Sequence, residues 1–140
     1  MLQTCTLTSY ILAAFVISIS DIKYRIIRNR DLTIFLAFGI VLNISDYSFK
    51  SFQTFSFASL ICVALHLAFK GRIGAGDLKS FWVISFWVNS FTSWLEGLTL
   101  AWILGGAFAL LYLALNKRNI RRSFSIPFAP FIFLGFLPAI

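Results

Sequence analysis

Two aspartates are the residues of this sequence whose types and positions could support chemistry. Among the five acidic residues of the 140-residue chain, Asp21 closes the first apolar segment and Asp77 opens the fourth. Ionisable groups near a bilayer are costly and usually functional. Two carboxylates at one depth can form an aspartic dyad, in which one is ionised and activates a water while the other is protonated and polarises a peptide carbonyl. The pair would share a proton near neutral pH, because like charges raise one pKa. Such peptide hydrolysis needs neither a metal nor a cofactor.

The residues around Asp77 strengthen this interpretation. Gly74 and Gly76 flank Ala75 directly before it, and residues without a side chain let a backbone, a neighbouring helix or an extended substrate approach the carboxylate closely. Lys79, two positions further on, could tune the pair electrostatically or reach toward lipid headgroups. We therefore predict Gly74, Gly76 and Lys79 as supporting residues.

Each aspartate also has an ordinary structural interpretation. Asp77 could simply be the N-cap of a helix, and Asp21 could form a surface ion pair with one of the basic residues that follow it. The combination of both acids on one predicted side with the two glycines favours catalysis. The remaining acids are expected to be structural: Asp31 at a helix start, and Asp46 and Glu96 in loops on the other side.

The elements that must position the two acids are transmembrane helices. The chain is 59% hydrophobic and only 12% charged, too apolar for a soluble domain of this length. We expect an all-α membrane protein with a single domain over residues 1–140. Its six apolar segments are Leu7–Ser20, Leu32–Ile44, Phe52–Phe69, Leu78–Phe91, Trp94–Leu115 and Ile126–Ile140. No Lys or Arg precedes position 21, so the first segment is expected to be a retained helix rather than a signal peptide.

The basic residues give an independent test of this count. Cytoplasmic loops are enriched in Lys and Arg, and with six spans eleven of the twelve basic residues fall on one side. Lys50 is the exception. The eleven are Lys23, Arg25, Arg28, Arg30, Lys70, Arg72, Lys79, Lys117, Arg118, Arg121 and Arg122. We therefore expect a bundle of about six transmembrane helices in the bacterial inner membrane, with both termini on the periplasmic side and both aspartates at the cytoplasmic face.

The net charge of +7 is explained by the Lys and Arg residues of the predicted cytoplasmic loops. The basic residues mark loops and form no continuous patch, so membrane lipid is expected as a partner and nucleic acid is not. Cys5 and Cys62 lie in or beside apolar segments without a CxxC pair, and neither a metal site nor a disulfide is predicted from them.

At these residues the sequence resembles the type IV prepilin peptidases, membrane aspartic proteases with a Gly-x-Gly-Asp motif. The run from Gly74 to Lys79 is similar to the second catalytic motif of that family, and the run from Asp21 to Asn29 is similar to the first, with Arg28 in place of the usual proline. Residues 126–135 are similar to its final helix.

The resemblance implies an endopeptidase that cleaves the basic leader from prepilins or pilin-like precursors at the cytoplasmic face, with Asp21 and Asp77 as the catalytic pair. It implies a small form that only cleaves, similar to the enzymes of tight-adherence pilus systems. Two alternatives remain open from the residues. One is an intramembrane Gly-x-Gly-Asp protease for another class of substrate, and the other is a small transporter or assembly subunit that uses the two aspartates as ion ligands.

Overall fold

The chain folds into a bundle of helices. The computed structural model describes residues 2–44, 48–69, 73–115 and 126–140, and all regular elements within these ranges are helical. They are α1 (Leu2–Tyr24), α2 (Asn29–Asn43), α3 (Phe49–Phe69), α4 (Ala75–Ile84), α5 (Phe91–Leu115), α6 (Ala129–Phe136) and the 3₁₀ turn η2 (Leu137–Ala139). The all-α class and the six helical segments predicted from the sequence are therefore found in the described part of the chain.

The six helices differ in length, and α2 with 15 residues lies between the two extremes. Three of them, α1, α3 and α5, contain stretches that are long and apolar enough to cross a membrane: Thr4–Tyr24, Phe49–Phe69 and Phe91–Leu115. By contrast α4 has 10 residues and α6 has 8. At ~1.5 Å per residue these two helices cover about half or less of a ~30 Å hydrocarbon core. The exposed surfaces of the long helices are lined with large apolar side chains, as in a membrane protein.

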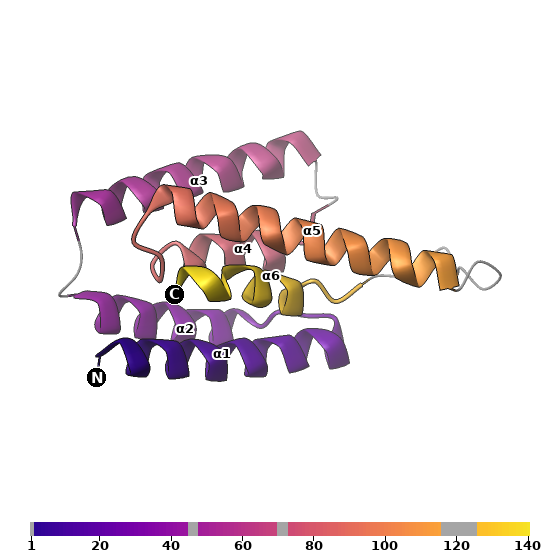
Figure 1. Ribbon diagram of the computed structural model, residues 1–140, viewed down its shortest axis with the longest axis horizontal. Helices are drawn as coiled ribbons and strands as arrows, with labels where there is room; N and C mark the ends of the chain where they lie inside the picture. The colour runs from indigo at the N-terminus through magenta and orange to yellow at the C-terminus, as the bar shows by residue number, and fades with distance from the viewer. Residues whose placement is uncertain (1, 45–47, 70–72, 116–125) are drawn as a thin grey trace.

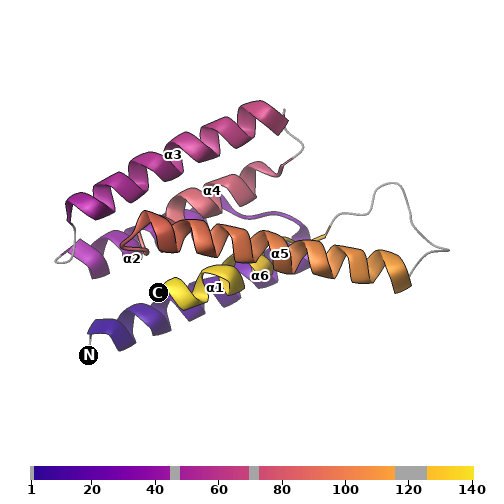
Figure 2. The same ribbon diagram turned by 45° about the horizontal axis from the view of Figure 1, so that its top comes forward.

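The two short helices occupy the middle of the bundle. Helix α4 packs against α2, α3 and α6, and α6 packs against α1, α4 and α5. Figures 1 and 2 show both short helices between the longer ones, with the N- and C-termini at the same end of the bundle. The site-bearing starts of α4 and α6 are therefore held from several sides.

The fourth segment differs from its predicted extent. A continuous helix was expected over Leu78–Phe91, but α4 ends at Ile84 and a turn leads into α5 at Phe91. The Ser90 hydroxyl accepts a hydrogen bond from the Ser93 amide at 3.1 Å, which is the geometry of a helix N-cap. The apolar residues Trp87 and Val88 of the turn are buried in the core. The apolar run thus reflects burial of a turn rather than a longer helix.

Two smaller differences concern the ends of helices. Because α5 begins at Phe91, Glu96 lies on an exposed turn of this helix and not in a loop. The last helix begins at Ala129 and not at Ile126, where the predicted segment starts, so Pro127 precedes the helix and Pro130 lies in its first turn. Of the predicted loop residues, Asp46, Lys70, Arg72, Lys117, Arg118, Arg121 and Arg122 lie outside the described residues.

An aromatic cluster joins the helices away from the glycine-rich motif. The rings of Phe35 and Trp87 stack with centroids 4.6 Å apart, and Tyr10 packs 5.7 Å from each of them. The Tyr10 hydroxyl donates a hydrogen bond to the Phe133 carbonyl at 3.0 Å, and the Trp87 indole donates one to the Phe35 carbonyl at 3.2 Å. These contacts fix α1, α2, α6 and the α4–α5 turn against one another.

Helix α6 lies unusually close to α5. A Cβ atom on Gly135 would stand 2.5 Å from the Ala101 backbone nitrogen, and one on Gly97 would overlap the Phe136 ring. Only glycine permits this approach of two backbones. The close packing sets the position of the whole of α6, including its first residue, which contacts the candidate site.

Candidate active site

Asp21 lies in the last turns of α1 with its side chain turned into the bundle. The residue is only 7% exposed. Its Oδ2 atom accepts a hydrogen bond of 3.0 Å from the backbone amide of Ala129, the first residue of α6. A negative charge on Asp21 is therefore placed at the positive end of the α6 dipole and on one of its otherwise unpaired amides. The ordinary interpretation is wrong in placing Asp21 at the surface, because the residue is buried.

Asp77 is the third residue of α4. The N-cap position belongs to Gly74, which makes no side-chain cap bond, so the interpretation of Asp77 as an N-cap is also wrong. The Asp77 carboxylate folds back over the start of the helix, where a Cβ atom on Gly74 would come within 2.8 Å of Oδ2. Glycine at position 74 leaves the space that this carboxylate occupies.

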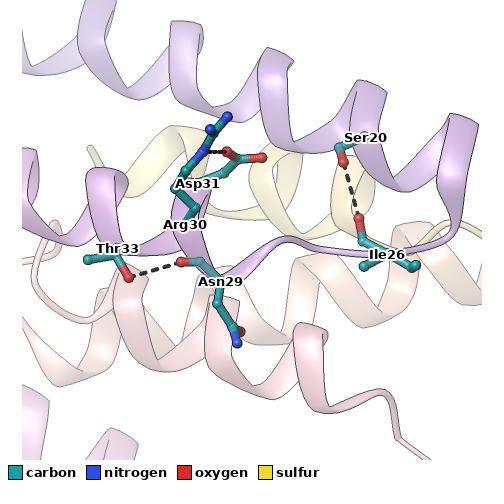
Figure 3. Close-up of polar contacts among 6 residues, drawn as sticks. All are labelled: Ser20, Ile26, Asn29, Arg30, Asp31 and Thr33. Carbon is teal, nitrogen blue, oxygen red and sulfur yellow. Dashed lines mark hydrogen bonds and ion pairs between the residues drawn. The ribbon is translucent and has the colours of Figure 1, made fainter.

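The second glycine of the motif has a different neighbour. A Cβ atom on Gly76 would lie 3.0 Å from the Cβ atom of Ile27, in the connection between α1 and α2. This connection is itself tied to α1, because the Ser20 hydroxyl donates a hydrogen bond to the Ile26 carbonyl at 3.2 Å (Figure 3). Gly76 thus allows α4 to pack on the segment that immediately follows Asp21.

The two carboxylates line one cavity of about 460 Å³. The wall is completed by the α1–α2 connection, the glycine motif and the residues before α6, namely Arg25, Ile26, Ile27, Gly74, Ala75, Gly76, Ile126 and Phe128. Burial raises the pKa of Asp77 to about 6, and the nearby negative charge of Asp21 raises it in the same direction. At mildly acidic pH, Asp77 therefore carries a proton.

Lys79 connects α4 with α2 rather than approaching the carboxylates. Its Nζ atom donates a hydrogen bond of 3.0 Å to Oδ1 of Asn29, the first residue of α2. Two further contacts lie at the start of α2. The Thr33 hydroxyl donates a hydrogen bond to the Asn29 carbonyl at 2.9 Å, and Arg30 and Asp31 form an ion pair at 3.6 Å (Figure 3). Arg28, which stands where the resembling family has proline, takes the extended N-cap conformation of α2.

The α1–α2 connection contains one unusual backbone conformation. Arg25 directly follows α1 with a φ of 56°, in the left-handed region, and its amide donates to the Asp21 carbonyl at 2.9 Å. This is the common way to end a helix, although glycine usually takes the position. The turn lets the chain reverse direction directly beside Asp21.

Three parts of the site were not predicted from the sequence. The Ala129 amide, and the Ile126 and Phe128 side chains, come from the start of α6, more than 100 positions from Asp21. Arg25 comes from the α1 end. The one sequence signal for this part of the site is the pair Pro127 and Pro130, because proline is common at the start of a helix. That signal locates an amide-rich helix end but does not say which carboxylate it meets.

No three His, Cys, Asp or Glu side chains in the described ranges gather into a group that could hold a metal ion. The chemistry that these residues themselves offer is acid–base chemistry between two carboxyl groups in a partly enclosed cavity.

A membrane bundle with two carboxyl groups in one cavity is the architecture expected of an intramembrane or membrane-face aspartic peptidase. The chain matches the type IV leader peptidase family over residues 8–115 and belongs to that family. Both aspartates lie in the matched part, while α6 lies beyond it. Comparison with curated proteins and with solved structures gave no match. The protein is thus a membrane peptidase of the leader peptidase family.

Proposed function

We propose that this protein is an aspartic endopeptidase that removes the basic leader peptide from prepilins or pilin-like precursors, with Asp21 and Asp77 as its catalytic pair. The observation that carries the proposal is the shared cavity, in which one carboxyl group has a raised pKa and the other accepts a backbone amide. Membership of the leader peptidase family supports the class of substrate.

The two environments give the two acids different roles. Asp21, on the amide of Ala129, is the ionised partner that takes a proton from the attacking water. Asp77 is the protonated partner that donates to the carbonyl oxygen of the scissile peptide. The water oxygen bonds to the carbonyl carbon and gives a tetrahedral intermediate. The proton held by Asp21 then passes to the amide nitrogen, the C–N bond breaks, and Asp77 recovers its proton as the new carboxyl group forms.

We place the two aspartates at the cytoplasmic face of the bacterial inner membrane, and the arrangement of the helices supports this placement. Both termini lie at one end of the bundle, and the α1–α2 connection with its basic residues lies at the other (Figure 1). Under the positive-inside rule that end is cytoplasmic, and both termini are periplasmic. We count α4 and α6, which lie between longer helices and do not span the hydrocarbon core by themselves, among the six membrane helices, and we regard residues 1–140 as a single peptidase domain.

Replacement of each aspartate by asparagine tests the proposal. We expect Asp21→Asn and Asp77→Asn, expressed with a prepilin in cells that lack their own leader peptidase, to leave the precursor at full length. Asparagine at position 21 keeps an oxygen that can accept the Ala129 amide, so the fold is retained. Glu96→Gln, on an exposed turn of α5, is the matched control and should process the precursor like the wild type. Trimming by both aspartate variants would show that the dyad is not catalytic.

A further inference from the structure

A second cavity meets the dyad cavity at Asp77. The second, of about 390 Å³, lies between α4 and α5. The two cavities share four wall residues, Gly74, Asp77, Ile126 and Phe128. The two cavities are therefore adjacent at the Asp77 carboxyl group.

The two cavities differ in chemistry. The dyad cavity adds the second carboxylate of Asp21 and the charged side chain of Arg25. The second cavity, which we call the α4–α5 cleft, adds no further charged residue: Ile73, Phe81, Trp102, Gly105, Gly106 and Ala109 complete its wall. The surroundings thus change from polar to apolar across Asp77, where the scissile bond would lie.

The cleft reaches the outer surface of α5. Trp102 is 42% exposed at its edge, and Gly106 is exposed as well. The adjacent Gly105 faces the Phe128 ring, whereas a Cβ atom on Gly106 would meet no atom within 4 Å. Because α5 is long and apolar enough to cross the membrane, the cleft opens toward the region that lipid tails or an apolar segment of a second protein would occupy.

We propose that the α4–α5 cleft binds the apolar segment that directly follows the cleaved bond in the precursor. This inference rests on the proposed function. A precursor in which a polar leader precedes an apolar helix matches the polar-to-apolar change across Asp77, and its segment can enter from the membrane beside α5. Gly106 of α5 leaves room for a backbone to lie against the helix.

Photo-crosslinking tests the position of the substrate without requiring cleavage. A photoreactive amino acid replaces Trp102 in the full-length Asp77→Asn protein, in membranes that contain a pilin-like precursor with a basic leader and an apolar helix of about 20 residues. We expect a crosslink to the first residues of that apolar helix. The same group at Leu111, an exposed residue that helical geometry places on the opposite side of α5, is the control and should give at most a weak crosslink.

A steric variant tests the same inference in the active enzyme. Gly106→Leu fills the cleft, and leucine favours a helix more than glycine does, so the fold is retained. We expect kcat/KM for the full precursor to fall about tenfold or more. For a short soluble peptide that ends four residues after the cleaved bond, the fall should stay within about threefold, because this peptide does not fill the cleft. Leu111→Phe should cleave both substrates like the wild type.

The outcomes separate this inference from the proposed function. Crosslinking at Trp102 to lipid only, or equal rates for Gly106→Leu and wild type on the full precursor, would overturn the cleft as the binding site. An equal loss on both substrates would also overturn it, because it would indicate damage to the dyad. A Trp102 crosslink to the precursor in a protein whose wild-type form cuts nothing would support the cleft and reject the peptidase function.

Discussion

At the scale of single residues, the site depends on the different surroundings of two identical side chains. Asp21 is met by a backbone amide at the positive end of α6, while Asp77 is partly buried beside another carboxylate. The first setting favours a negative charge and the second opposes it. In the proposed mechanism, this difference allows one aspartate to act as the base and the other as the acid.

The raised pKa of Asp77 predicts a pH-dependent stability. Its folded value of about 6 lies above the ordinary value of 3.8, so the folded state binds the proton more tightly than the unfolded chain. Stability is therefore lost as the pH rises from about 4 to 6, and the loss is complete above that range. We expect Asp77→Asn, which cannot ionise, to be more stable than the wild type at pH 8 by about 1–2 kcal/mol, with no difference near pH 4. Thermal unfolding in detergent at both pH values measures this, and an equal difference at both would contradict it.

A second prediction at the scale of single residues concerns Gly74. Its φ of −58° and ψ of 130° suit any residue, so alanine introduces no backbone strain. The new Cβ atom would come within 2.8 Å of the Asp77 Oδ2 atom and turn the carboxyl group away. We expect Gly74→Ala to lower kcat about tenfold to a hundredfold while the melting temperature stays close to that of the wild type. Unchanged cleavage with this variant would show that the position of the carboxyl group is not limiting.

At the scale of elements, the short helices α4 and α6 each bring their first turn to the site. The positions of these first turns depend on contacts with neighbouring elements. In α4, Gly76 packs on Ile27 and Lys79 donates a hydrogen bond to Asn29. Helix α6 packs closely on α5 at Gly135. Because hydrogen-bonded helix interiors are stiff, a shift at one end of α6 moves the amide at its other end.

The α5–α6 contact is therefore expected to control the site from a distance. Gly135→Ala would place a Cβ atom 2.5 Å from the Ala101 backbone nitrogen, which cannot move aside as a side chain could. We expect a loss of about 1–3 kcal/mol in the free energy of unfolding, together with reduced cleavage as the Ala129 amide leaves Asp21. Unfolding and activity are measured in the same detergent preparation. Leu134→Ala, on the exposed side of the same helix, should leave both nearly unchanged, and equal behaviour of the two variants would contradict the argument.

At the scale of the whole molecule, the two termini lie far from the end of the bundle that carries the candidate site. The N- and C-termini lie together at one end of the bundle, and the turn after Asp21 lies at the other (Figures 1 and 2). In the proposed orientation this end faces the cytoplasm, so a substrate whose leader has remained there would meet the two aspartates without crossing the membrane.

This orientation can be measured with thiol labelling. Cys5 is an exposed residue near the N-terminus, whereas Cys62 is buried. We expect a membrane-impermeant thiol reagent to label Cys5 in cells with a permeable outer membrane and an intact inner membrane. A cysteine in place of the exposed Arg28, in a protein without Cys5, should be labelled only after the inner membrane is opened. The reverse order of labelling would contradict the proposed orientation.

Much of the fold was available from the sequence because membrane solvation leaves a strong pattern. Long apolar stretches must be helical to satisfy their backbone, and this predicted the helices and their number. The same pattern failed at Leu78–Phe91, since a buried turn and a buried helix are equally apolar. It also could not show that α4 and α6 are short inner helices.

The sequence by itself singled out the two acids that we propose as the catalytic pair, because charged residues are rare at membrane depth and Gly74 and Gly76 mark one of them. Tertiary structure alone decided how they differ. The Ala129 amide reaches Asp21 through the packing of α6 against α1, α4 and α5. Gly74 leaves space for the Asp77 carboxylate, whereas Gly76 leaves space for Ile27. These contacts join residues far apart in the chain, and their partners are fixed by close packing rather than by local sequence.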